Sequence, residues 1–234
     1  MTGGSRPELE SRNEKPGKGM ISMKVELQNV LPEEIEKRSF EIITRELGNI
    51  SLDPAEEPVI KRVIHTTADF EYLENLKFSK DAVRIGIEAL KKGAVIVTDT
   101  QMAKAGINKG TLEALGGEAF CFMADEDVAE AAKANGTTRA TASMEKAAAL
   151  DRPLIFAIGN APTALVRIYE LVKEGRLRPE LIIGVPVGFV NVVESKELIM
   201  ELDVPHIVAK GRKGGSNVAA AICNAMLYQC RPRT

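Results

Sequence analysis

Residues Leu154 to Ala164 read LIFAIGNAPTA and combine three features that decide the fold. The first part, LIFAIG, is a short apolar run ending in Gly, which is typical of a strand buried on both faces of a sheet. Gly159 and Asn160 then break the run, and Pro162 is tolerated in the first turn of a helix. The segment therefore predicts a buried strand, a tight loop and a helix, in that order.

The same succession of strand, loop and helix recurs along the chain. Four further apolar runs have the length and β-branched content of buried strands, and helical periods separate them. Besides residues 154–159, the predicted strands are Ala94 to Asp99, Glu118 to Met123, Leu181 to Pro186 and His206 to Gly211. Because strands and helices alternate, we expect an α/β fold. It should be a three-layer single domain with a mainly parallel five-stranded sheet flanked by helices.

Seven helices are predicted around this sheet. The first follows Pro32, where apolar residues between Ile35 and Leu47 recur at helical spacing. Ser39 falls in the same apolar stripe, so its side chain is expected to point inward. The other helices are expected near Lys80 to Lys91, Ala124 to Ala134, Thr138 to Leu150, Pro162 to Glu174, Val192 to Leu202 and Asn217 to Gln229.

The composition is that of an ordinary globular protein. Of the 234 residues, 44% are hydrophobic and 27% are charged, which excludes a disordered or fibrous class. The net charge of -2 and the aromatic content of 4% argue against a nucleic-acid partner, because such proteins need basic faces and stacking rings. The longest apolar stretch, residues 181–193, is shorter than the roughly 20 residues that span a bilayer, so no membrane association is expected.

The amino-terminal residues and the cysteines bear on organisation and location. Residues 1–23 are polar and lack the apolar block of a signal peptide. We expect residues 1–23 to form a mobile tail ahead of one α/β domain, residues 24–234. The three cysteines are odd in number and form no CxxC motif, which argues against a disulfide framework or a zinc site. A cytoplasmic protein without a bound metal is favoured.

Three of the predicted strands end in small, polar, glycine-rich loops. These are GNAPTA (residues 159–164), GFVNVVES (residues 188–195) and GRKGGSN (residues 211–217), and each leads into a helix. In such a sheet, ligands bind beyond the carboxyl ends of the strands, where helix N-termini present free N–H groups. Three such loops on one edge predict a ligand with several negative groups.

These loops supply most of the candidate binding residues. Arg212 and Lys213 add two cations to the GRKGGSN loop, although a tight turn with Ser216 as N-cap would explain the same residues. Capping is also the favoured explanation for Asp99 and Thr100, which end the first predicted strand. Asn160 in the GNAPTA loop is a good N-cap as well, so capping alone could explain that loop. The candidate set is Asp99, Thr100, Gly159, Asn160, Ala161, Gly188, Asn191, Arg212, Lys213, Gly214 and Gly215.

Two further side chains are candidates for chemistry. Arg139 is expected in the first turn of a helix, where a cation opposes the helix dipole, so it is either a solvated arginine or a guanidinium aimed at an anion. His65 can donate a proton near neutral pH, or it can be a structural histidine. Residues 66–69 look like the cap and acidic first turn of a helix. Because a helix N-terminus disfavours imidazolium, an acid role would need a nearby carboxylate or an anionic ligand.

Six segments in order carry a family resemblance: RVIHTTADFEY, VTDTQMAKAGI, TTRATASMEKA, FAIGNAPTAL, IIGVPVGFVNVVESKELI and GRKGGSNVAAAICNAML. Each motif is weak by itself, but six in order across about 200 residues are highly specific. The chain after about residue 25 closely resembles the precorrin-8X methylmutase family, also called cobalt-precorrin-8 methylmutase. The resemblance implies an isomerase of cobalamin biosynthesis that moves a methyl group from C-11 to C-12 of a corrin precursor, giving hydrogenobyrinate or cobyrinate.

The resemblance also implies site residues and a mechanism. The family's catalytic histidine falls on His65, its active-site arginine on Arg139 and the serine of its first helix on Ser39. The family mechanism is a sigmatropic shift in which the histidine protonates, or hydrogen-bonds to, a ring nitrogen beside the migrating centre. The family works as a homodimer with sites near the subunit interface, and it uses no cofactor or external methyl donor.

A corrin precursor is a macrocycle fringed by acetate and propionate carboxylates, which fits a site built from three glycine-rich helix starts. Two other functions remain open. A non-catalytic tetrapyrrole carrier would need these loops but not His65. Both a carrier and the isomerase could hand the bound corrinoid product to the next pathway enzyme. A nucleotide-dependent Rossmann enzyme rests only on the strand and loop pattern, since the GxGxxG and GxxxxGK[ST] fingerprints are missing.

Overall fold

The structure, a computed structural model, describes residues 31–231, without the side chain of Glu33. The chain divides after Ile35 into two units. In the first unit, the described segment contains the short 3-10 helix η1 (Pro32–Glu34). The predicted tail, residues 1–23, lies outside the described residues. The sheet belongs to the second unit, residues 36–234.

A six-stranded sheet has the strand order β1-β6-β5-β4-β2-β3. Its five parallel strands are β2 (Val95–Thr98), β3 (Glu118–Phe120), β4 (Leu154–Ile158), β5 (Leu181–Gly184) and β6 (His206–Ala209). All five predicted strands are confirmed, each shorter than expected. The prediction of five strands was one too few, because β1 (Leu76–Phe78) pairs antiparallel with β6. Three residues with a central Lys give no strand signal in the sequence.

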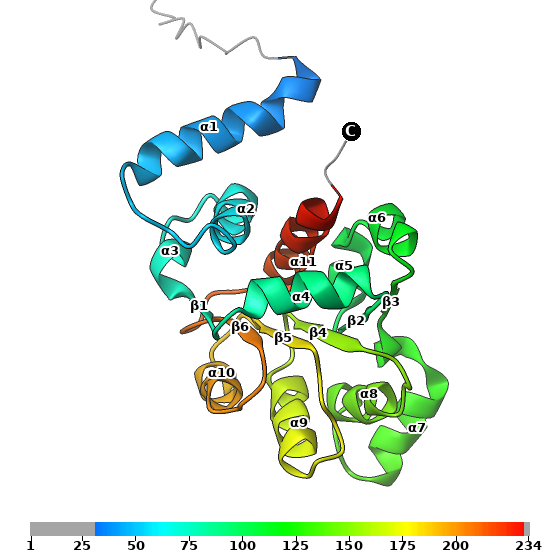
Figure 1. Cartoon of the computed structure of the whole chain (residues 1–234). Helices are drawn as coiled ribbons and strands as arrows, with labels where there is room; N and C mark the ends of the chain where they lie inside the picture. Colours follow the sequence, from blue (N-terminus) through cyan, green and yellow to red (C-terminus); the bar gives the residue numbers. More distant parts are fainter. Residues whose placement is uncertain (1–30, 232–234) are drawn as a thin grey trace, which may run out of the picture. The chain divides into compact units, whose positions relative to one another are not determined.

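Helices cover both faces of this sheet, which confirms the three-layer α/β architecture (Figure 1). One face carries α2 (Glu57–Thr67), α4 (Ala82–Lys91), α5 (Gln101–Gly106), α6 (Lys109–Ala114) and α11 (Ser216–Cys230). The other face carries α7 (Glu126–Ala134), α8 (Arg139–Ala148), α9 (Pro162–Lys173) and α10 (Val192–Met200). The remaining elements are α1 (Ile35–Leu47), α3 (Tyr72–Asn75) and the 3-10 helix η2 (Phe122–Ala124).

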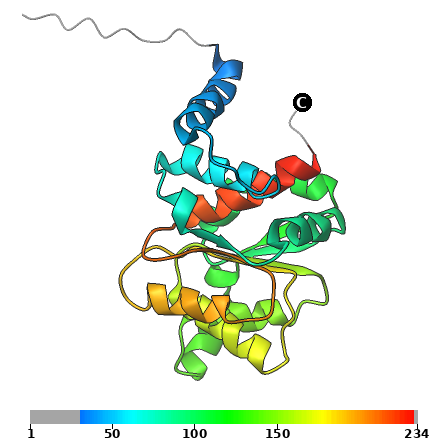
Figure 2. The same ribbon diagram turned by 60° about the vertical axis from the view of Figure 1, so that its left-hand side comes forward.

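Successive residues of a strand point to opposite faces, and β4 therefore contributes to two cores. Ile155 and Ala157 pack with the helices around α2 and α11, whereas Phe156 and Ile158 pack with α8 and α9. The turned view in Figure 2 shows the sheet edge-on between α11 and α2 above and α9 and α10 below. Burial on both faces explains why the predicted strands are apolar throughout.

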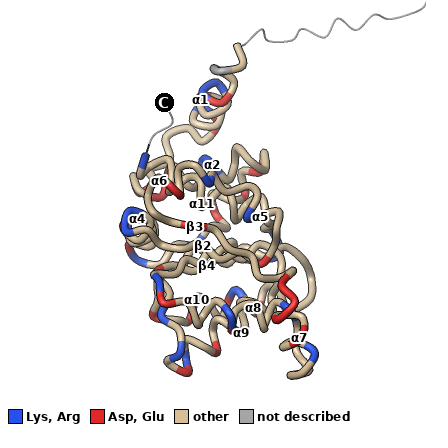
Figure 3. The backbone as a smooth tube through the Cα atoms, turned by 90° about the vertical axis from the view of Figure 1, so that its right-hand side faces the viewer, with Lys and Arg blue, Asp and Glu red and all other residues tan. Residues whose placement is uncertain are grey.

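Charged residues lie mainly on the helices and loops, and β2, β3 and β4 between them carry few (Figure 3). Within residues 31–231, no helix is long and apolar enough to cross a membrane. Cys121, Cys223 and Cys230 are all free thiols.

The first predicted helix, α1, matches its apolar stripe only in part. Ile43 and Leu47 are buried, but Ile35 is 53% exposed. Ser39 is half-buried, so it does not point fully inward as expected. The predicted apolar stripe is therefore buried only in the carboxyl-terminal half of α1, where the helix packs against the rest of the second unit.

The close approach of Gly159 to the start of α11 gives a test of the fold. A Cβ on Gly159 would lie 2.7 Å from the Cα of Ser216 and 2.8 Å from the carbonyl oxygen of Gly215. Because backbone cannot yield as a side chain does, we expect Gly159→Ala to lower the free energy of unfolding by about 2–3 kcal/mol. Gly110→Ala is the matched control: the nearest atom is 3.7 Å away, and Ala should stabilise α6 by up to about 1 kcal/mol. Urea unfolding followed by circular dichroism measures both; equal stabilities would contradict the close approach.

Candidate active site

The carboxyl end of β2 is followed by Asp99, whose side chain is buried (1% exposed). Its carboxylate accepts the backbone N–H groups of Gly159 at 2.9 Å, Asn160 at 2.7 Å and Ala161 at 2.6 Å. Burial favours the neutral carboxyl and the three donors favour the charged one; burial is the larger effect and raises the pKa of Asp99 above its ordinary value. Asp99 therefore fixes the loop between β4 and α9 from inside the protein.

This arrangement changes the role of the GNAPTA loop. We expected its backbone N–H groups to be free to bind an anion, but those of Gly159, Asn160 and Ala161 already donate to Asp99. The expectation of a free N–H cradle is therefore wrong for this loop. The N-cap of α9 is Ala161 rather than Asn160, and no side chain caps it. The exposed side chain of Asn160 keeps its place as a predicted ligand contact.

Thr100 joins the start of α5 to the start of α11. Its Oγ1 accepts the N–H of Ala103 at 3.0 Å, so the favoured capping role of Thr100 is confirmed. The same hydroxyl hydrogen-bonds to the hydroxyl of Ser216 at 2.7 Å. Ser216 is the first residue of α11 and Gly215 is its N-cap, so the alternative in which Ser216 caps this helix is wrong.

The loops that follow β5 and β6 are hydrogen-bonded to each other. The N–H of Gly188 donates to the carbonyl of Arg212 at 3.1 Å, and the N–H of Gly215 donates to that of Val185 at 2.8 Å. A Cβ on Gly214 would lie 2.1 Å from the carbonyl oxygen of Val185, so a side chain at this position is sterically excluded. The predicted binding glycines 188, 214 and 215 thus lie together. Asn191, the exposed N-cap of α10, ends the first of these loops.

Lys196 in α10 holds the second loop from inside. Its side chain is fully buried, and its Nζ donates to the carbonyl oxygens of Gly211 at 2.7 Å and Lys213 at 2.8 Å. Burial lowers the pKa of Lys196 to about 8. In a planar trans peptide the C=O and the next N–H point in opposite directions. Turning these two carbonyls inward therefore directs the N–H groups of Arg212 and Gly214 outward.

The two cations of this loop have different surroundings. Lys213 forms ion pairs with Asp69 and, at 2.9 Å, with Glu71. The hydrogen bond between Lys213 and Asp69 raises the pKa of the lysine and lowers that of the carboxyl. Within the described residues Arg212 forms no ion pair, and its guanidinium lies 5.3 Å from the ring centroid of Phe189. Phe189 is 81% exposed, so this cation and ring face solvent together.

His65 lies in the last turn of α2, which continues to Thr67 and ends at the left-handed Ala68. The interpretation of residues 66–69 as the start of a helix is therefore wrong. The hydroxyls of Thr66 and Thr67 hydrogen-bond to carbonyls one turn earlier, at 2.9 and 2.8 Å. The carboxyl end of a helix favours positive charge, so the electrostatic objection to an acid role for His65 is removed.

Neighbouring contacts connect His65 with two other predicted site regions. The ring of Phe40, the residue after Ser39, stacks on the imidazole with centroids 5.2 Å apart. Asp69, four residues after His65, is the partner of Lys213 in the loop after β6. The structure thus places Ser39, His65 and the GRKGGSN loop on adjoining segments.

Arg139 lies apart from this group. It is the first residue of α8, which confirms its predicted place in a first helical turn, and Thr138 is the N-cap. Thr138 also donates to the hydroxyl of Thr163 at 3.1 Å, so the starts of α8 and α9 lie together. These helices cover the face of the sheet opposite to α2 (Figure 1). Arg139 is exposed and, among the described residues, has no hydrogen bond or ion pair.

Residues 34–229 match the family model described as Precorrin-8X methylmutase. The chain belongs to this family. A Cobalt-precorrin-8 methylmutase of Priestia megaterium is 48% identical over 197 residues, which cover 84% of this chain and 88% of the relative. A Cobalt-precorrin-8 methylmutase of Salmonella typhimurium is 46% identical over 86% of this chain and 96% of its own. A crystal structure of the precorrin-8X methyl mutase from Thermus thermophilus matches with a TM-score of 0.77 at 40% identity, over 84% of this chain and 97% of that one.

These findings confirm the family and the enzyme class that the sequence predicted. The chain is a methylmutase, an isomerase of cobalamin biosynthesis, and the alternative of a non-catalytic carrier is not favoured. Among residues 31–231, no cluster of three or more His, Cys, Asp or Glu residues is placed to hold a metal ion.

Three parts of the site of this methylmutase were not predicted from the sequence: Lys196, Phe189 and the helix α2. Lys196 interrupts the buried stripe of Val192, Ser195 and Ile199 in α10, and a lysine at helical spacing among buried residues was a usable signal. The apolar residues of α2 also recur at helical spacing after Pro58. No local signal identifies Phe189 as exposed, because its environment depends on the loop after β6.

The buried ammonium of Lys196 gives a pH-dependent test. Between about pH 8 and pH 10.5 the unfolded chain keeps a proton that folded Lys196 has lost, so this group increases stability as the pH rises. We expect the unfolding free energy of the wild type, relative to Lys196→Met, to rise by on the order of 1 kcal/mol between pH 7 and pH 10. Urea unfolding of both proteins at both pH values measures this change. A difference that does not vary with pH would contradict the buried, uncompensated charge.

Proposed function

We propose that this methylmutase moves the methyl group from C-11 to C-12 of cobalt-precorrin-8 to give cobyrinate. The cobalt form is supported by the curated relatives at 48% and 46% identity, which are both named as cobalt-precorrin-8 methylmutases. In this reaction the cobalt ion belongs to the substrate. The metal-free precorrin-8X, which would give hydrogenobyrinate, is the alternative substrate.

The observation that carries the proposal is the ion pair between Lys213 and Asp69. It connects the segment after His65 with the loop that exposes Arg212 and two outward N–H groups. Charged and N–H donors of this kind suit the acetate and propionate carboxylates of the macrocycle. The exposed side chains of Phe189 and Val190, at 81% and 77%, suit its flat apolar face.

In the proposed mechanism His65 is the general acid. It protonates, or donates a hydrogen bond to, a ring nitrogen beside the migrating centre, which makes the accepting carbon more electrophilic. Assistance of this type is worth about 10²- to 10⁴-fold in rate. Binding the rim carboxylates holds the macrocycle so that the methyl group lies over its destination. Ser39 and Arg139 are proposed to contact the substrate, with Lys213 fixing the loop rather than acting as a free cation.

We also propose that the chain works as a cytoplasmic homodimer. Support comes from the family resemblance and from Arg139, which lies on the sheet face opposite to α2. A second copy could bring its own Arg139 to the His65 of the first. Product hand-over to the next pathway enzyme is proposed on the same resemblance.

The variant His65→Ala tests the catalytic assignment. We expect turnover to fall at least about 100-fold, because the proton donor is lost, while product affinity changes less than about twofold. Conversion of cobalt-precorrin-8 and of precorrin-8X is followed by absorbance, and product binding by titration. Thr66→Ala, the exposed neighbour in α2, is the matched control and should keep wild-type turnover. Wild-type turnover by His65→Ala would remove His65 from the mechanism.

Arg212→Ala tests the binding surface. We expect it to weaken product binding about tenfold and to flatten the dependence of affinity on salt, because one charge-assisted contact is lost. Arg178→Ala, an exposed arginine before the amino end of β5, is the control and should bind like the wild type. Spectrophotometric titration gives the affinities, and gel filtration of the coloured complex reports its size. Equal affinity of both variants at low ionic strength would contradict an anion-binding role for Arg212.

A further inference from the structure

The imidazole of His65 is oriented in an unusual way for a proton donor. In proteins, the second ring nitrogen of a working histidine commonly hydrogen-bonds to a carboxylate or a carbonyl. Among the residues that the structure describes, neither ring nitrogen of His65 has such a partner. The nearest carboxylates along the chain, Asp69 and Glu71, are paired with Lys213. The orientation of the imidazole must therefore depend on another contact.

That contact is the ring of Phe40 in α1. The Phe40 and His65 rings are stacked, with an interplanar angle of 15° and centroids 5.2 Å apart. A proton moves along the N–H bond, which lies in the plane of the imidazole. A neighbour parallel to that plane limits rotation of the ring about its Cβ–Cγ bond. Stacking is strong enough to favour one orientation by up to about tenfold.

Phe40 is itself held by Arg62, which lies one turn before His65 on α2. The Arg62 guanidinium is 4.7 Å from the centroid of the Phe40 ring and 5.1 Å from that of Tyr228 in α11. Its Nη1 also pairs with Glu36 of α1 at 2.7 Å. Arg62 thus connects three helices, and its position does not depend on Phe40 alone.

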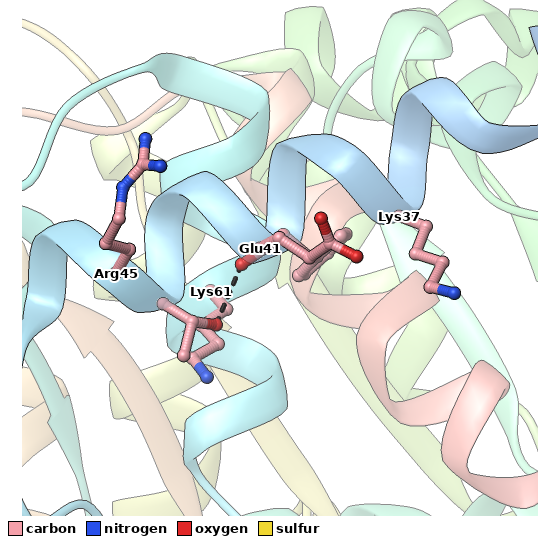
Figure 4. Close-up of a pocket in the computed structure, with 6 residues that line it drawn as sticks. Lys37, Glu41, Arg45 and Lys61 are labelled. Atoms are coloured by element: carbon pink, nitrogen blue, oxygen red, sulfur yellow. Dashed lines mark hydrogen bonds between the residues drawn. The ribbon is translucent and has the colours of Figure 1, made fainter. Parts of the chain in front are cut away.

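Burial alone does not hold the Phe40 ring. Phe40 is only half-buried and lines a cavity of about 500 Å³ together with Thr44 and four charged residues. Figure 4 shows these charged side chains around the cavity, with Lys37, Glu41 and Arg45 on α1 and Lys61 on α2. A ring beside open space can turn unless specific contacts fix it, and the Phe40 ring stacks on His65 and lies under the Arg62 guanidinium.

We propose that Phe40 is a positioning residue for His65, with Arg62 holding Phe40 in turn. The inference rests on the proposed role of His65 as the proton donor. The stack fixes the imidazole plane and leaves both ring nitrogens without a hydrogen-bond partner among residues 31–231, so that one of them can face the substrate. A displacement of about 1 Å at a reacting group can cost 10²-fold in rate, so a modest loss of orientation should be measurable.

Phe40→Leu and Phe40→Tyr separate orientation from packing. Leu keeps an apolar side chain but cannot stack, so we expect kcat to fall about 3- to 10-fold with KM and product affinity unchanged within twofold. Tyr keeps the ring, so kcat should return to within about twofold of the wild type. Lys37→Ala, which alters the same helix and cavity without touching His65, is the control and should keep wild-type kcat.

A spectroscopic measurement reports the stack directly. The chain has two histidines, so His65→Ala assigns the ring protons of His65 in an NMR spectrum. Removing the Phe40 ring should shift these protons downfield in Phe40→Leu, whereas Phe40→Tyr should keep them near their wild-type position. These shifts do not depend on turnover.

Three results would overturn the proposal. Wild-type kcat in Phe40→Leu, together with an inactive His65→Ala, would remove Phe40 and leave the proposed mechanism intact. Equal loss of kcat in Phe40→Leu and Phe40→Tyr, or a change confined to KM, would show that Phe40 packs or binds substrate instead. Wild-type turnover by His65→Ala would overturn both roles together.

Discussion

The buried carboxylate of Asp99 organises the carboxyl edge of the sheet. By accepting three successive N–H groups from Gly159 to Ala161, it sets the turn between β4 and α9. This geometry lets the backbone at Gly159 pass beside Gly215 and Ser216, where no Cβ would fit. The start of α11 is thereby fixed, and α11 packs against α2, which carries His65. A carboxylate whose burial raises its pKa is a costly way to build a turn, but its three donors recover part of that cost.

At the same edge of the sheet, some charged side chains are buried and hold the loops in place, whereas others face solvent. Asp99 and Lys196 are buried and point into loops, one accepting N–H groups and the other donating to carbonyls. Lys213 is used in ion pairs with the segment after α2. Arg212 is the cation of the GRKGGSN loop that faces solvent beside an exposed aromatic ring. The number of charged residues in these loops therefore overstates the number that are free to bind a ligand, because most of these groups are already paired within the protein.

The sequence predicted the parts of the fold that depend on local pattern. Buried strands such as LIFAIG are apolar on both faces, and helices such as α9 repeat at 3.6 residues, so both are visible without a structure. β1 was missed because it is a three-residue edge strand whose pairing with β6 depends on residues 129 to 133 positions away. The end of α2 was misread because TTAD fits a helix start equally well, and only the left-handed Ala68 decides the direction.

The candidate site was less predictable, for a related reason. Which residue types gather at the strand ends follows from sequence and topology, and most of the expected residues do lie there. Their partners do not follow from the sequence. The donors to Asp99 are about 60 residues away, and the acceptor of the Lys213 ammonium lies 144 positions earlier in the chain. The buried partners Asp99 and Lys196 decide that the N–H groups of residues 159–161 face inward and that those of Arg212 and Gly214 face outward.

The proposed binding groups lie in the loops at the carboxyl edge of the sheet, whereas the proposed proton donor, His65, lies at the end of α2. Binding and catalysis are therefore assigned to different groups. The rim carboxylates of the proposed substrate are the same before and after the methyl group moves, so contacts with them stabilise substrate, transition state and product alike. Rate enhancement must come from a group whose interaction strengthens as the methyl migrates, and His65 is the proposed residue. Strong rim contacts then favour slow release of product. For this reason, the paired lysine at Lys213 suits the reaction better than a second free cation would, because it positions the loop without tightening the grip on the product.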